Sequence, residues 1–161
     1  MLKKILLFLL IALIIIQFIH PEKNKADGAQ PDFIGTVFAV PEKVNLILAK
    51  ACNDCHSNKT NYPWYCNIQP VHWWMNNHIM EAKKELNFDE YKNRSLRFQY
   101  HKMEEIVEQV KEGDMPLFSY TLIHRDAKLT QAEKNELINW ADGIRESLKA
   151  KYPMDSLIRI K

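Results

Sequence analysis

Residues 52–56 are Cys52-Asn53-Asp54-Cys55-His56, a C-x-x-C-H sequence. This spacing is the attachment signature of a c-type haem. Two thiols three positions apart can reach the two vinyl groups on one edge of a porphyrin, and the adjacent histidine then lies beneath the iron as its proximal ligand. The sequence therefore predicts one covalent haem c, attached through Cys52 and Cys55, with its iron bound by His56.

Two other kinds of site use closely spaced cysteines. A thiol–disulfide oxidoreductase normally places C-x-x-C at the start of a helix that follows a strand, whereas here a predicted helix precedes Cys52. A structural zinc site needs a second pair of ligands, and Cys66 has no partner at the usual spacing. We expect Cys66 to be a small buried residue, with an exposed free thiol as the alternative.

The second axial ligand of the iron is expected among the remaining methionines and histidines. Met115 follows Gly113 in a loop between two predicted helices, where its thioether can reach the haem face opposite His56. Met75 and Met103 fall on apolar helix stripes, where methionine usually fills a core. The sequence favours Met115 as the ligand, followed by His78, and leaves an open or water-bound position as a further possibility.

From Pro41 onward, apolar residues recur at helical spacing, and no stretch alternates as a strand does. The third predicted helix ends at Gly113, a suitable left-handed cap, and the last begins with a capping box from Thr130 to Glu133. The fold class is therefore all-α. The predicted helices start at Pro41, at Pro70, at about Ser95 and at Thr130.

Residues 1–20 contain Lys3 and Lys4 followed by an apolar run from Ile5 to Ile19 that only Gln17 interrupts. This pattern predicts an N-terminal transmembrane or signal-anchor helix. A cleaved signal peptide is the alternative, although no small-x-small cleavage pattern follows the run directly. Residues 21–40 are expected to form a linker and an extended segment that packs on the domain.

The composition fits one compact domain. The chain has 161 residues, of which 47% are hydrophobic and 26% charged, too few for a large multidomain enzyme. Without Lys3 and Lys4, the basic and acidic residues are equal in number. No basic footprint for nucleic acid is present, so we expect no nucleic-acid partner.

Beyond the C-x-x-C-H motif, the chain resembles the haem-binding domain family of small single-haem c-type cytochromes. The resemblance covers about residues 33–148. It is carried by Cys52 to Asn58, Tyr62 to Tyr65, Ile68, Pro70, Val71, Trp73, His78, Leu86 to Phe88, Gly113 to Leu117, Tyr120, His124, Ala127 to Leu129, Glu133 and Trp140.

The resemblance implies a cytochrome c-like helical domain around one haem, over residues 41–150, followed by a C-terminal tail over residues 151–161. It also implies a bacterial cytoplasmic membrane protein with a single N-terminal span and its haem domain in the periplasm. By the same resemblance, Cys52, Cys55 and His56 carry the haem, and Met115 is the distal ligand.

With His56 and Met115 both bound, the iron has no position left for oxygen or peroxide, and methionine ligation raises the potential into the range of electron carriers. The expected function is single-electron transfer between redox protein partners, without enzymatic activity. The alternative is a haem-based sensor or peroxidase-like module with an open or labile sixth site.

Three secondary expectations concern the surroundings of the haem. A backbone carbonyl between Asn61 and Pro63 is a candidate hydrogen-bond acceptor for the second ring nitrogen of His56. An aromatic group is expected to pack against the porphyrin, formed by Tyr62, Trp64, Tyr65, Trp73 and Trp74. Four basic residues are expected chiefly to solvate helix faces, with pairing to the haem propionates as the alternative, and these are Lys83, Lys84, Arg94 and Arg97.

Overall fold

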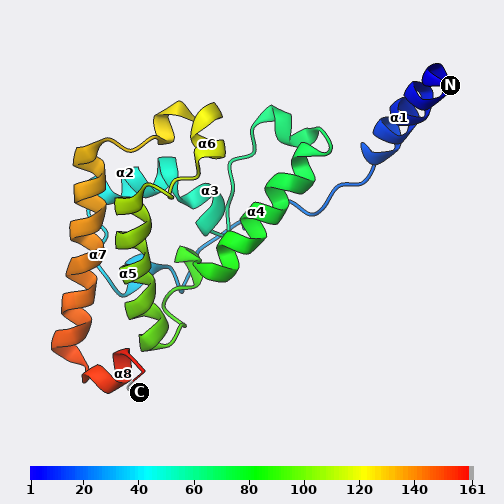
Figure 1. The fold of residues 1–161 in the computed structure, drawn as a ribbon. Helices are drawn as coiled ribbons and strands as arrows, with labels where there is room; N and C mark the ends of the chain where they lie inside the picture. Colours follow the sequence, from blue (N-terminus) through cyan, green and yellow to red (C-terminus); the bar gives the residue numbers. More distant parts are fainter. Residues whose placement is uncertain (160–161) are drawn as a thin grey trace.

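The computed structural model describes residues 1–159, which form helices joined by loops (Figure 1). No strand occurs in this range, and extended pairing is limited to one isolated bridge between Lys25 and Lys59. The predicted all-α class is confirmed. The last two residues of the predicted tail over 151–161 lie outside the described residues.

Three long helices build the core of the domain. Helix α5 (Leu96–Glu112) packs along α7 (Gln131–Lys151), and α2 (Glu42–Ala51) contacts α7 near its start (Figure 1). Each helix buries one apolar stripe, because residues three and four positions apart share a face. The buried members include Val44, Ile47, Leu48, Met103, Val107, Val110, Leu137, Ala141 and Ile144.

The ends of these helices follow from local chemistry. The Ser95 hydroxyl accepts from the Phe98 amide at the start of α5, which Gly113 ends in the left-handed conformation at φ 85°. Helix α7 begins with the expected capping box between Thr130 and Glu133. Such caps satisfy backbone groups that a helix end leaves unpaired, so the sequence located these ends to within about one residue.

Shorter elements complete the domain. Helix α4 (Val71–Glu85) lies beside α3 (Asn53–His56), the single turn that carries all of the C-x-x-C-H motif except Cys52. Helix α8 (Met154–Leu157) returns the chain to α5 and α7. The remaining short helices are η1 (Ile34–Thr36), η2 (Trp64–Asn67), η3 (Phe88–Glu90), α6 (Phe118–Ile123) and η4 (Arg125–Ala127).

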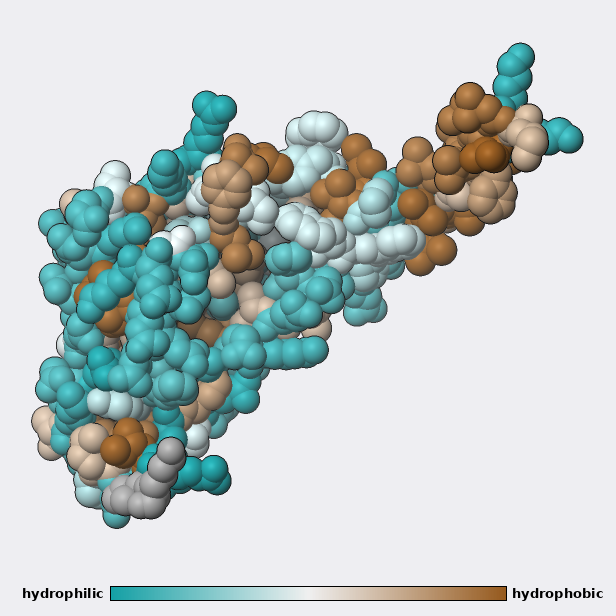
Figure 2. Space-filling model, viewed as in Figure 1, coloured by the Kyte–Doolittle hydropathy of each residue, from teal (hydrophilic) through white to brown (hydrophobic). Residues whose placement is uncertain are grey.

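Helix α1 (Leu2–Ile16) extends away from the domain and buries none of its side chains (Figures 1 and 2). Over residues 1–159, no helix is long and apolar enough to cross a membrane. The predicted transmembrane helix over residues 1–20 is therefore not supported, because the helix ends at Ile16 after 15 residues.

The chain that follows α1 is hydrogen-bonded to the start of α4. The Gln17 side chain donates to the Gln69 carbonyl at 3.2 Å and accepts from the Gln69 amide at 2.9 Å. The Trp73 indole donates to the Ile19 carbonyl at 2.9 Å. We call this set of contacts the α1–α4 junction.

Further contacts continue along the same segment. The Nδ1 atoms of His20 and His72 lie 3.2 Å apart, and the His72 ring is completely buried. The Asn24 amide side chain donates to the Ser57 carbonyl at 2.9 Å, and the Asn24 backbone N–H donates to the Tyr62 hydroxyl. Residues 17–24 are thus attached to the domain beside the C-x-x-C-H motif.

Candidate haem-binding site

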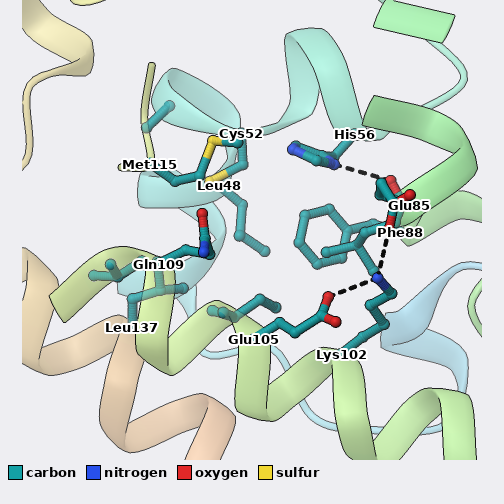
Figure 3. Close-up of a pocket in the computed structure, with 14 residues that line it drawn as sticks. Leu48, Cys52, His56, Glu85, Phe88, Lys102, Glu105, Gln109, Met115 and Leu137 are labelled. Carbon is teal, nitrogen blue, oxygen red and sulfur yellow. Dashed lines mark hydrogen bonds and ion pairs between the residues drawn. The ribbon is translucent and has the colours of Figure 1, made fainter. Parts of the chain in front are cut away.

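A cavity of about 310 Å³ opens next to the C-x-x-C-H motif, at the lower end of the range of ~300–1,000 Å³ typical of ligand pockets (Figure 3). It lies between α2, α3, the end of α4, α5 and the loop after α5. Its lining residues are Leu48, Ala51, Cys52, His56, Glu85, Leu86, Phe88, Lys102, Glu105, Ile106, Gln109, Val110, Met115 and Leu137.

His56 is oriented by the chain that follows α4. Its Nδ1 atom donates to the Leu86 carbonyl at 2.9 Å, and its ring packs edge-on against Phe88 (Figure 3). Burial lowers the pKa of His56, although the hydrogen bond to Leu86 opposes this effect. The lowered pKa favours the neutral imidazole, and with the proton on Nδ1 the lone pair of Nε2 is available to a metal.

The acceptor for His56 differs from the one expected. The sequence suggested a carbonyl between Asn61 and Pro63, which was wrong. Helix α3 is a single turn packed against α4, so the His56 ring meets the end of α4 at Leu86. This contact joins residues 30 positions apart, a separation that local sequence patterns do not reveal.

The three cysteines are free thiols. Burial, helped by the neighbouring Cys55, raises the pKa of Cys52 to about 12, and burial with the charge of Asp54 raises that of Cys55 to about 11. Cys52 lines the cavity, whereas Cys55 is not among its lining residues. Cys66 is completely buried with its Sγ 2.9 Å from Met75 Sδ, so its expected role as a small buried residue is confirmed.

Met115 reaches the cavity from the loop after α5. The backbone N–H groups of Gly113, Asp114 and Met115 all point to the Gln109 carbonyl, at 3.0, 3.0 and 3.3 Å, and so fold the chain back over the helix end. His78, the second candidate ligand, does not line the cavity. Its Nδ1 atom bonds to the Trp74 carbonyl in its own helix.

One face of α5 contributes a set of residues that sequence reasoning missed. Lys102, Glu105, Ile106 and Gln109 recur at helical spacing beside the apolar stripe, and all four line the cavity. The Lys102 side chain is only 9% exposed, and its ammonium donates to Glu105 at 2.6 Å and to Glu85 at 2.9 Å. No local sequence signal identifies this ion pair, because Glu85 comes from another helix.

None of the five aromatic residues expected against the porphyrin lines the cavity, so the structure does not support that prediction. Trp64 is 75% exposed, Trp74 50% and Trp73 36%, and Tyr65 bonds instead to His124. Among the described residues, the cavity is lined mainly by apolar side chains, with Phe88 as its one aromatic ring besides His56.

None of the four basic residues considered as propionate partners lines the cavity. Lys83 donates to Asn24, Arg94 lies over the Phe98 ring, and Arg97 donates to the Asp155 carbonyl. Each of these three therefore has another partner, and Lys84 lies on the exposed face of α4.

The family model described as a haem-binding domain matches residues 11–143 of the chain. The chain belongs to the haem-binding domain family. The match includes the C-x-x-C-H motif, the cavity and Met115, and it confirms the family that the sequence resembles. Neither the curated proteins nor the solved structures contain a match to this haem-binding domain.

The cavity of this haem-binding domain contains donors that suit an iron porphyrin. The neutral imidazole of His56 and the thioether of Met115 are both ligands of haem iron. Cys52 and Cys55 would supply the covalent bonds, and the aliphatic lining would shield the porphyrin from water. These residues fit haem as the cofactor.

Proposed function

We propose that this protein is a membrane-attached, monohaem c-type cytochrome that transfers single electrons. Cys52 and Cys55 hold the haem covalently, and His56 and Met115 bind its iron. When bound, the haem supplies a metal centre that cycles between the ferrous and ferric states. The protein donates and accepts electrons and transforms no substrate.

One observation carries this proposal: Cys52 and His56 of the C-x-x-C-H motif line the same cavity as Met115, which lies in a distant loop of the sequence. The hydrogen bond from His56 Nδ1 to Leu86 fixes the ring orientation and leaves Nε2 for the iron. With His56 and Met115 both bound, the iron would have no position left for oxygen or peroxide, which would favour an electron carrier over a sensor or peroxidase-like module.

Helix α1 supports attachment to the cytoplasmic membrane. Its leucine, isoleucine and phenylalanine side chains are exposed along its length and have no partner within the described chain (Figure 2). Insertion into lipid would cover this surface. We place the haem domain in the periplasm, where c-type haem is attached, with redox proteins as its partners.

The test uses protein expressed together with the c-type maturation machinery. A haem stain after denaturing electrophoresis reports covalent attachment, and absorption spectra of both oxidation states report the axial ligands. Met115→Ala is expected to convert a low-spin ferric spectrum into a high-spin one. Met80→Ala is the matched control, because Met80 is 46% exposed and lies outside the cavity.

The outcomes separate the possible functions. A stained wild type with a sulfur-to-iron band, lost only in Met115→Ala, supports the electron carrier. A high-spin wild type that binds carbon monoxide rapidly would favour the sensor or peroxidase-like alternative. A wild type without stained haem would contradict the c-type cytochrome and favour a thiol function for Cys52 and Cys55.

A further inference from the structure

Lys102 is a buried cation in the wall of the cavity. Its ammonium bridges Glu85 and Glu105, one from α4 and one from its own helix. Burying a charged group costs several kcal/mol unless it is paired, so such a lysine stays inside only with carboxylates close by. Over the described residues that line the cavity, Lys102 is the only lysine or arginine.

Lys102 lies at the end of the cavity where the propionate edge of a haem is expected. Figure 3 shows Cys52 at the upper left of the cavity, and Lys102 with the Glu105 carboxylate at the lower right. The two vinyl groups and the two propionates of haem lie on opposite edges of the porphyrin. Attachment of the vinyl edge at Cys52 and Cys55 would therefore direct the propionates toward the Lys102 end.

We propose that Lys102 binds a haem propionate, which replaces Glu85 as its partner. The proposal rests on the function proposed above, because it requires a haem attached at Cys52 and Cys55. Pairing with a propionate, the alternative role considered for Lys83, Lys84, Arg94 and Arg97, is thereby assigned to Lys102.

Charge and exposure identify which carboxylate leaves. One ammonium between two carboxylates already carries a net negative charge, and a third carboxylate at the same place would be repelled unless one moved away. The Glu85 side chain is 76% exposed, whereas that of Glu105 is 36% exposed. The Glu85 side chain can rotate toward the solvent at little cost. It therefore leaves Lys102, and the ion pair between Glu105 and Lys102 remains.

The experiment follows the propionates directly. Haem is labelled with ¹³C at its propionate carboxyl carbons by growth on labelled 5-aminolevulinate. Redox-difference infrared spectra and reduction potentials are then recorded for the wild type, Lys102→Met, Lys102→Arg and the control Lys111→Met. Lys111 lies on the same helix but is exposed and lies outside the cavity.

Lys102→Met is expected to shift the labelled carboxylate bands and to lower the reduction potential, because loss of a nearby cation favours the ferric state. Lys111→Met should leave the bands at their wild-type positions. If Lys102→Met does not fold, the spectrum of Lys102→Arg tests whether residue 102 binds the propionate. A guanidinium bound to the propionate alters the bands, whereas a residue 102 paired only with glutamates leaves them unchanged.

Two negative results have different meanings. Haem-loaded variants whose propionate bands all match the wild type would overturn the assignment of Lys102 and leave the proposed function standing. A wild type that carries no covalent haem would overturn both.

Discussion

Glu133 connects the start of α7 with α2 through a single carboxylate. Its Oε1 atom accepts from Lys50 at 2.6 Å, and its Oε2 atom accepts from the Thr130 backbone at 2.8 Å. The hydrogen bond from Lys50, followed by that from Thr130, lowers the pKa of Glu133 to about 2. The ionised carboxylate is thus favoured in the folded state.

The first prediction concerns Glu133→Gln. Glutamine also serves at this capping position, so the substitution removes mainly the ion pair with Lys50. We expect a loss of about 1 kcal/mol in the free energy of unfolding at pH 7. Because the folded pKa lies below the unfolded value of about 4.3, this difference is complete above about pH 5 and disappears as pH falls toward 2.

Urea unfolding of both chains at pH 7, 4 and 2.5 measures this difference. Glu136→Gln on the same helix is the control, since Glu136 makes no ion pair within the described residues. A difference between wild type and Glu133→Gln that stays constant down to pH 2.5 would show that the Lys50 contact carries no pH-dependent stability.

The sequence could predict those site residues whose role depends only on their near neighbours in the chain. The spacing of Cys52, Cys55 and His56 carries its meaning without the fold, and the loop position of Met115 follows from a helix cap two residues earlier. The buried state of Lys102 depends on Glu85 from another helix, and the exposure of Trp64 depends on which elements cover it. Neither property is encoded in local spacing.

Gly113 controls where α5 ends and how the chain turns toward Met115. Its φ of 85° is unfavourable for residues with a Cβ atom. A Cβ added there would lie 3.7 Å from Lys134 Nζ, an ordinary contact, so a substitution would cost backbone strain and no steric clash. Gly143 offers a comparison, because it lies inside α7 with open space at its Cβ position.

The second prediction pairs these two glycines. Gly113→Ala should lower the free energy of unfolding by about 1–2 kcal/mol, the cost of left-handed backbone for an ordinary residue. Gly143→Ala should raise it by about 0.5–1 kcal/mol, because alanine is the better helix former. Denaturant unfolding of the two variants checks both signs, and a Gly113→Ala chain as stable as wild type would mean that this turn carries no strain.

The long helices could be predicted because their stripes and caps are local. Ser95, Gly113 and the Thr130–Glu133 box each define an end within a few residues. The short helices α3 and α6 have too few residues to show a period, and the α1–α4 junction joins positions about 50 residues apart. Contacts of that range appear only once the chain has folded.

At the scale of the whole molecule, α1 and the domain present different surfaces. Figure 2 shows the apolar side chains of α1 at one end and a mostly hydrophilic surface over the helices at the other. The third prediction is that two charges in α1, Leu6→Lys with Leu10→Lys, reduce the fraction of full-length protein bound to phospholipid vesicles at least tenfold.

Cosedimentation with vesicles of phosphatidylethanolamine and phosphatidylglycerol measures this binding. The matched control carries Leu46→Lys and Leu122→Lys, two substitutions at leucines of the domain that are 62% and 59% exposed. If both double variants bind as the wild type does, α1 is not the membrane attachment. If the control loses binding equally, the effect belongs to added charge and not to α1.

In the proposed cytochrome, the α1–α4 junction would also affect how often electrons are exchanged. If α1 lay in lipid, the bonds from Gln17 to Gln69 and from Trp73 to Ile19 would hold the cavity at a set height and tilt above the bilayer. A domain held in this way does not sweep through the surrounding volume as one on a loose tether does. It would meet its proposed partners by lateral diffusion, so the rate of electron exchange would follow their number per unit area of membrane.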